Sequence, residues 1–83
     1  MSIYTATQLT EKVLKVFNDQ LGVRVQPHHT LREDLGTDSL DIIEIIMTLE
    51  DDFEIIIGDE EFDSVKTVDQ VISLIAERVG VSA

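Results

Sequence analysis

The chain has 83 residues, 43% of them hydrophobic, no cysteine, and 17 acidic against 6 basic side chains, for a net charge of −11. This apolar content is enough for one small core, and the missing cysteines exclude disulfides, thiolate nucleophiles and cysteine-containing zinc sites. The charge opposes binding to nucleic acid and insertion into anionic membranes, so we expect basic protein partners.

Residues 6–21 are predicted to form the first helix. Thr5 and Gln8 have the spacing of a capping box, in which each residue accepts a hydrogen bond from the backbone of the other. Gly22 is a natural C-terminal stop. The apolar residues recur in steps of three and four, as on one face of a helix: Leu9, Val13, Val16, Phe17 and Leu21.

A long loop and a second amphipathic helix follow. Residues 22–37 show no sustained hydrophobic period, so we expect a loop with a short turn near residues 31–35. Asp38 is a good N-cap, and Asp41 adds a second carboxylate at the positive end of the helix. The predicted outward polar stripe is Asp41, Glu44, Thr48 and Asp51. The predicted apolar set is Leu40, Ile43, Ile46, Met47, Leu49 and Phe53, with Ile42 and Ile45 widening it.

The last part of the chain predicts two more helical segments. Residues 55–57 are three isoleucines, which we interpret as an extended segment that fills the core, because a lone strand has nothing to pair with. Residues 59–63 are expected to form a short helical turn. Thr67 and Gln70 repeat the capping box and begin a helix that Gly80 ends. Its predicted inner face is Val68, Val71, Ile72, Ile75 and Val79.

These elements predict an all-α fold, a small bundle of three main helices plus one short helix, in a single domain over residues 1–83. No apolar run is long enough for a membrane span and no signal-peptide pattern is visible, so we expect a cytoplasmic protein, and a monomer. We expect no metal site, because the two histidines are adjacent and the acidic segment does not fit the calcium-loop template.

The acidic residues are concentrated in one segment. Between Glu33 and Asp63 there are 13 acidic residues and no Lys or Arg. A solvated helical face explains most such runs. The alternative is a docking surface for positively charged partners, which a long segment of one charge sign favours.

Ser39 is the residue that chemistry singles out, although no catalytic site is expected. It has no histidine nearby in sequence to act as a base, and its surroundings lack the second glycine of a nucleophile elbow. It stands at a helix start, where free N–H groups would suit a phosphoester on its hydroxyl. The alternative, which spacing alone favours, is an ordinary helix-start residue next to the Asp38 cap.

The run from Glu33 to Asp41, E-D-L-G-T-D-S-L-D, is followed by Glu44, Met47, Leu49, Glu50 and Phe53. This pattern resembles the signature of the acyl carrier proteins, the phosphopantetheine-binding carriers of type II fatty-acid and polyketide synthesis. The resemblance implies a non-enzymatic carrier in which Ser39 holds a 4′-phosphopantetheine arm, derived from coenzyme A, through a phosphodiester. The terminal thiol of that arm holds acyl groups as thioesters.

The resemblance also implies partners and further site residues. The expected partners are a phosphopantetheinyl transferase (holo-acyl-carrier-protein synthase) and acyl-transfer and chain-elongation enzymes with basic docking patches. The matching docking positions are Asp38, Asp41, Glu44, Glu50 and Asp51. The expected acyl pocket is lined by Ile43, Met47, Leu49, Ile57, Phe62, Val65 and Leu74, each of which could also be plain core packing.

Three departures from the family pattern leave the pathway open. The loop after Gly22 looks a few residues shorter than is usual in the family. Gly58 stands where proline is common, and Phe62 stands where a small residue is common, which would narrow the pocket. The alternatives are a housekeeping fatty-acid carrier, a carrier for a specialised polyketide or another acyl or aminoacyl pathway, and an unmodified acidic interaction protein.

Overall fold

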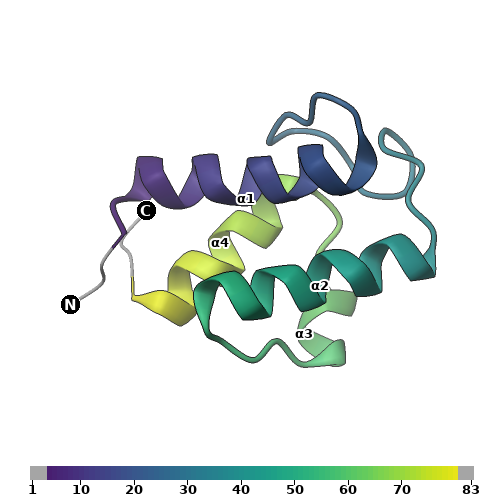
Figure 1. Cartoon of the computed structure of the whole chain (residues 1–83). Helices are drawn as coiled ribbons and strands as arrows, with labels where there is room; N and C mark the ends of the chain where they lie inside the picture. Colours follow the sequence, from purple (N-terminus) through teal and green to yellow (C-terminus); the bar gives the residue numbers. More distant parts are fainter. Residues whose placement is uncertain (1–3, 81–83) are drawn as a thin grey trace.

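A computed structural model describes residues 4–80, apart from the side chain of Asp59. This part of the chain contains four helices and no strand (Figure 1). The expected all-α class is therefore confirmed, and each helix lies where the sequence predicted it. The helices are α1 (Ala6–Leu21), α2 (Ser39–Phe53), α3 (Asp59–Asp63) and α4 (Val68–Val79).

The three long helices begin at the predicted capping boxes. The N–H of Gln8 donates to Oγ1 of Thr5 at 3.1 Å, and the N–H of Asp41 donates to Oδ1 of Asp38 at 2.9 Å. The same arrangement begins α4 at Thr67. Each box satisfies N–H groups that have no partner within the helix. The starts of these three helices are therefore determined by hydrogen bonds between residues close in sequence.

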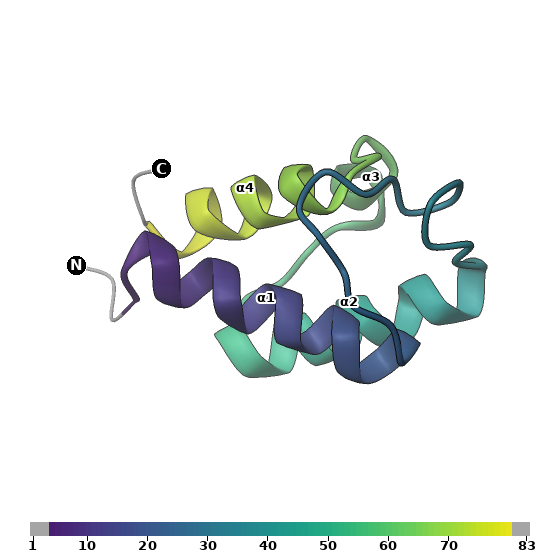
Figure 2. The same ribbon diagram turned by 90° about the horizontal axis from the view of Figure 1, so that it is seen from above.

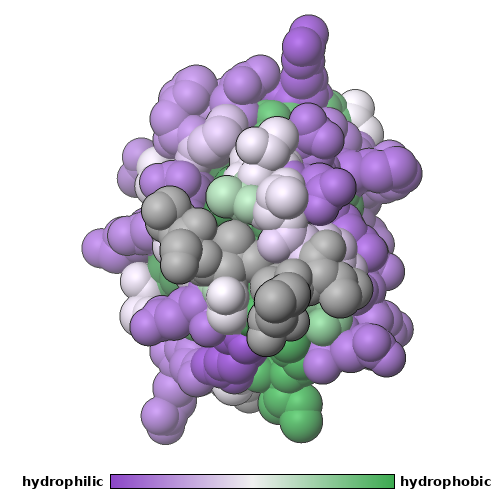
Figure 3. Space-filling model, turned by 90° about the vertical axis from the view of Figure 1, so that its left-hand side faces the viewer, coloured by the Kyte–Doolittle hydropathy of each residue, from purple (hydrophilic) through white to green (hydrophobic). Residues whose placement is uncertain are grey.

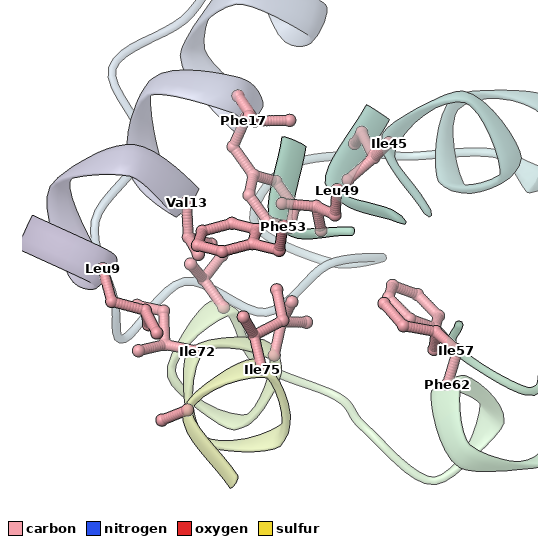
Figure 4. Packing of buried hydrophobic residues seen from close by; sticks show 14 of the residues in the cluster. Leu9, Val13, Phe17, Ile45, Leu49, Phe53, Ile57, Phe62, Ile72 and Ile75 are labelled. Atoms are coloured by element: carbon pink, nitrogen blue, oxygen red, sulfur yellow. The ribbon is translucent and has the colours of Figure 1, made fainter. Parts of the chain in front are cut away.

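The core lies between α1, α2 and α4. Figure 2, seen from above, shows α4 along one side of α1 and α2 along the other. In Figure 4, side chains from these three helices point toward one another, and Ile57 and Phe62 extend the cluster toward α3. The largest side chains with less than 2% exposure are Phe17, Leu9, Ile45, Leu49, Ile75, Val13, Val68 and Val71.

Helix α2 turns only part of the predicted apolar set to the core. Its buried residues are Ile45, Leu49 and Phe53. Three residues of the predicted apolar set are exposed instead: Leu40 (63%), Ile43 (52%) and Met47 (59%). The prediction that Ile43 and Met47 pack inward is wrong. Four isoleucines within five positions give α2 two adjoining apolar stripes, and the stripe through Ile45 packs against α1.

The connector between α2 and α3 fills the core at one point, as expected for residues 55–57. Ile57 is buried, with 6% of its surface exposed, whereas Ile56 is 79% exposed. Figure 3 views the molecule from the left-hand side of Figure 1. This face is mostly hydrophilic, with a hydrophobic projection at its lower edge, where the connector runs in Figure 1. One of the three isoleucines therefore seals the core while another meets solvent.

A short backbone pairing, which the sequence did not predict, joins the long loop to the start of α4. The N–H of Leu31 donates to the carbonyl of Lys66 at 2.9 Å, and the N–H of Val68 donates to the carbonyl of His29 at 3.0 Å. These bonds flank an isolated antiparallel bridge between Thr30 and Thr67. The loop is thereby fixed beside the α3–α4 connection.

None of the helices in residues 4–80 has the length and apolar character needed to cross a membrane.

Candidate functional site

Ser39 is the first residue of α2, and its side chain is exposed. Capping of the helix falls to Asp38, whose carboxylate accepts the N–H of Asp41. The hydroxyl of Ser39 makes no hydrogen bond to any other described residue. The local sequence therefore separates two tasks: the aspartate stabilises the helix end, and the serine next to it is left with a free oxygen.

A cavity of about 640 Å³ opens beside Ser39, between α2, α3 and the two segments that the bridge joins. Six of its twelve lining residues are apolar: Leu31, Ile42, Ile43, Ile46, Phe62 and Val65. Its remaining lining residues are polar or charged: Thr30, Arg32, Glu33, Ser39, Asp63 and Lys66. Phe62 also belongs to the core and is only 5% exposed, so its ring separates the cavity from the interior. Ser39 and these apolar side chains therefore line one cavity.

The structure brings three of the seven expected pocket residues to this cavity: Ile43, Phe62 and Val65. The other four are absent from its lining. Leu49 and Ile57 are buried in the core, Leu74 packs against that core, and Met47 is exposed on α2. The cavity therefore lies nearer the start of α2 than expected.

Two lining residues of α2 were missed, and a sequence signal for them existed. Ile42 and Ile46 follow Ser39 by three and seven positions, so they share its side of the helix. Helical spacing measured from Ser39 predicts both residues, whereas the apolar pattern of the whole helix does not distinguish them.

The five expected docking residues fall into two groups. Asp38, Glu44 and Asp51 are exposed, as a docking surface requires. Asp41 is half-buried and takes part in the capping box, where it accepts the N–H of Asp38 at 3.3 Å. Glu50 is half-buried too, and its Oε2 accepts the N–H of Ile57 at 2.9 Å. Glu50 therefore holds the connector to α2, a structural role that sequence reasoning missed.

The outward face of α2 is mixed rather than purely acidic. Glu44 and Asp51 alternate along it with Leu40 and Met47, and all four side chains are exposed. Thr48, expected on the outward polar stripe, instead accepts a hydrogen bond from Gln20 of α1 at 3.0 Å. We call Leu40, Glu44, Met47 and Asp51 the outer face of α2.

The turn that precedes the serine is braced by reciprocal hydrogen bonds. The N–H of Thr30 donates to Oδ2 of Asp34 at 2.8 Å, and the N–H of Asp34 donates to Oγ1 of Thr30 at 2.9 Å. The backbone hydrogen bond from Thr30 is the main cause that lowers the pKa of Asp34 below its usual value. Thr37 is buried, and its hydroxyl donates to the carbonyl of Leu31 at 2.6 Å. The approach to Ser39 is thus an ordered turn.

Within residues 4–80 no group of three or more His, Asp or Glu side chains is placed to hold a metal ion.

The sequence model of the phosphopantetheine attachment site family matches residues 11–75, a span that includes the serine, the cavity and the outer face of α2. The chain belongs to the acyl carrier protein family. Two solved acyl carrier protein structures have the same fold. A protein from Mycobacterium tuberculosis, assigned as an acyl carrier protein, is 30% identical with a TM-score of 0.79, and the match covers 83% of this chain and 96% of that one. The acyl carrier protein from Thermotoga maritima is 28% identical with a TM-score of 0.74, and the match covers 90% of this chain and 91% of that one.

As an acyl carrier protein, the chain is a carrier without catalytic activity of its own, and its prosthetic group is 4′-phosphopantetheine. Its partners are a phosphopantetheinyl transferase and enzymes that handle acyl groups. The residues around α2 fit this prosthetic group, because an exposed and unbonded hydroxyl belongs to the lining of a cavity that also has apolar side chains.

Proposed function

We propose that Ser39 carries the 4′-phosphopantetheine arm and that the chain transports acyl groups for fatty-acid synthesis or a related acyl pathway. The observation that carries the proposal is the free hydroxyl of Ser39 beside the apolar lining residues of the cavity. The arm supplies a thiol, which accounts for thioester chemistry in a chain without cysteine.

Attachment uses the oxygen of Ser39 as the nucleophile. Ser39 Oγ forms a bond to the phosphorus of coenzyme A that bears the pantetheine, and the bond from that phosphorus to the bridging pyrophosphate oxygen breaks. The hydroxyl proton passes to a base of the transferase, and adenosine 3′,5′-bisphosphate leaves. Asp38 keeps the helix capped throughout, because the cap does not use the serine hydroxyl.

The cavity supports a hydrocarbon cargo. The apolar half of its lining consists of aliphatic side chains and one phenylalanine. Each buried CH₂ group of an acyl chain contributes about 0.8 kcal/mol. We therefore favour acyl chains of the fatty-acid or polyketide type.

The outer face of α2 is the proposed docking surface for these enzymes. Glu44 and Asp51, with Asp38 near the serine, present exposed carboxylates that steer basic patches toward Ser39. The exposed Leu40 and Met47 add apolar contact area between them. Asp41 and Glu50 contribute charge, while their carboxylates also hold the structure.

Intact mass spectrometry tests the attachment site. Incubation of the protein with coenzyme A and a phosphopantetheinyl transferase is expected to add one arm, and Ser39→Ala is expected to abolish the addition. Peptide mapping then locates the arm. An arm on Ser64 or Ser73, or persistence in Ser39→Ala, contradicts the assignment, and no addition to the native protein favours the unmodified interaction protein.

Charge reversal tests the docking surface. Glu44→Lys and Asp51→Lys change exposed side chains that form no ion pair with any described residue. We therefore expect stability changes within about 0.5 kcal/mol. The association rate with the transferase is expected to fall, and the difference from the native protein to shrink as salt is raised. Glu77→Lys on α4 makes the same change of charge elsewhere and serves as the control. Equal losses for Glu77→Lys and Glu44→Lys would show that net charge alone matters.

A further inference from the structure

The six basic side chains divide into three with partners and three without. Lys12 donates to the hydroxyl of Tyr4 at 3.2 Å, Lys15 pairs with Asp19 at 2.8 Å, and Arg78 pairs with Glu61. The remaining side chains make no ion pair or hydrogen bond within the part of the chain that the structure describes: Arg24, Arg32 and Lys66. In a chain with 17 acidic residues, unpaired cations are unexpected.

Two of the three unpaired cations line the same cavity as Ser39. Arg32 and Lys66 flank the acidic segment in sequence, one just before Glu33 and the other shortly after Asp63. The hydrogen bond from the N–H of Leu31 to the carbonyl of Lys66 brings the two ends of that segment together. The fold thereby gathers two cations that are distant in the chain at the rim of one cavity.

Two carboxylates already accept backbone N–H groups at the start of α2, where an anion on Ser39 would lie. Asp38 and Asp41 use their carboxylates to cap α2, so two negative charges stand beside the serine. Glu33 and Asp63 add two more on the rim of the cavity. Within this lining, Arg32 and Lys66 are the cations that can compensate a further negative charge at the serine. Guanidinium and ammonium groups form charge-assisted hydrogen bonds to phosphate oxygens, and Arg can do so with two N–H groups at once.

We propose that Arg32 and Lys66 bind the phosphodiester through which the arm is attached to Ser39, and so direct the arm toward the cavity. This inference rests on the proposed function, since it requires the arm to be on Ser39. Glu33 and Asp63 on the same rim weaken the hold, which allows the arm to swing out when a partner binds. The two cations act as positioning residues between the serine and the cavity.

The ³¹P NMR signal of the phosphodiester tests the proposal without any enzyme assay. Native protein, the Arg32→Gln/Lys66→Gln double variant and Arg24→Gln are loaded to completion, as judged by intact mass. We expect the ³¹P relaxation of the native protein at low salt to follow the tumbling of the whole molecule. At about 1 M salt, where the Debye length is about 3 Å, the phosphorus is expected to become more mobile.

The variants separate the proposal from a general effect of charge. The double variant is expected to show the mobile phosphorus at both salt concentrations, whereas Arg24→Gln, which loses an exposed charge away from the cavity, is expected to behave like the native protein. Arg32→Lys keeps the charge and is expected to retain part of the immobilisation. Equal relaxation in the native protein and the double variant overturns the proposal, as does an equal effect of Arg24→Gln.

Melting temperatures give a second and independent readout. The phosphodiester gains its two ion pairs only in the native protein, and each is of the modest strength of a pair near the surface. Arm attachment is therefore expected to raise the melting temperature of the native protein roughly 4 °C more than that of the double variant. An equal change in both proteins counts against the proposal. Failure of the native protein to accept an arm at Ser39 overturns the proposed function instead, so the two failures are distinguishable.

Discussion

Arg78, in the last turn of α4, ties three elements together through one guanidinium group. Nη1 donates to the carbonyl of Ile56 in the connector, and Nη2 donates to Oε1 of Glu61 in α3. The other carboxylate oxygen of Glu61 accepts the N–H of Gly58 at 3.2 Å. Helix α3 has only 5 residues, and Phe62 is its buried anchor. Without the guanidinium group, α3 is held to the rest of the protein mainly by the buried ring of Phe62.

We expect Arg78→Gln to destabilise the protein by about 1.5 kcal/mol, most of it from the lost hydrogen bond between a charged donor and the carbonyl of Ile56. The ion pair with Glu61 adds little, because both of its side chains are substantially exposed and solvent screens the attraction. For a domain of this size, that loss of stability lowers the melting temperature by roughly 6–12 °C.

The stability that the ion pair between Arg78 and Glu61 contributes depends on pH. The hydrogen bond from Arg78, followed by that from Gly58, holds the pKa of Glu61 below its ordinary value of 4.5. A lowered pKa in the folded state contributes stability above the ordinary pKa, and that contribution is lost as the pH falls through the folded value. The difference between native protein and Arg78→Gln is therefore expected to narrow as the pH falls below about 4.5.

Thermal unfolding at neutral and acidic pH, with amide hydrogen exchange of residues 57–63, measures both effects. Exchange in this segment is expected to accelerate in Arg78→Gln while the core amides of α1 remain protected. Lys15→Gln, which removes an exposed pair within α1, is the control and is expected to leave the melting temperature almost unchanged. Equal melting temperatures for the two variants would refute the reasoning. A difference that does not change with pH would show that the ion pair with Glu61 contributes nothing to stability.

The acidic segment, Glu50 and Phe62 give three further expectations. The melting temperature is expected to rise with salt, and more with millimolar Mg²⁺, because the 13 acidic residues between Glu33 and Asp63 repel one another. A melting temperature that stays constant or falls as salt is raised would show that repulsion between these acidic residues does not destabilise the protein. Glu50→Ala is expected to cost about 1.5 kcal/mol and to accelerate exchange of the Ile57 amide, whereas Glu50→Gln, which keeps an acceptor, retains most of the stability. Equal losses for these two variants would contradict the hydrogen bond. Phe62→Leu is expected to cost about 1.5 kcal/mol in the unloaded protein and to extend the cavity, so that longer acyl chains raise its melting temperature more than that of the native protein. Identical dependence on chain length would show that Phe62 does not limit the cavity.

The helix ends could be predicted because they depend on neighbours in sequence. Thr5 with Gln8 and Asp38 with Asp41 determine the helix starts through hydrogen bonds between residues three positions apart. The same locality made Ser39 identifiable, since it lies inside a short and specific run.

The face of α2 and the shape of the cavity could not be predicted in this way. Ile42, Ile43, Ile45 and Ile46 are chemically alike, and which of them meets α1 depends on packing between helices. The pairing of Leu31 with Lys66 joins two segments without any hydrophobic period, so the sequence carries no sign of it. The cavity is bounded by both of these features, which is why four of the seven residues expected to line the acyl pocket lie outside this cavity.

The backbone bridge near Thr30 and Thr67 has a consequence for how such a protein can diversify. It closes residues 32–65 into a lobe whose two ends adjoin. Ser39, most of the cavity lining and the outer face of α2 belong to this lobe, while α1 and α4 form the base on which it rests. Segments whose ends lie close together are the ones that proteins exchange with least disturbance. The lobe needs its buried core residues Ile45, Leu49, Phe53, Ile57 and Phe62 to stay docked, whereas its outward positions are free to change. Under the proposed function, substitutions confined to this lobe, less than half of the chain, can change the partner and the cargo while α1 and α4 stay the same.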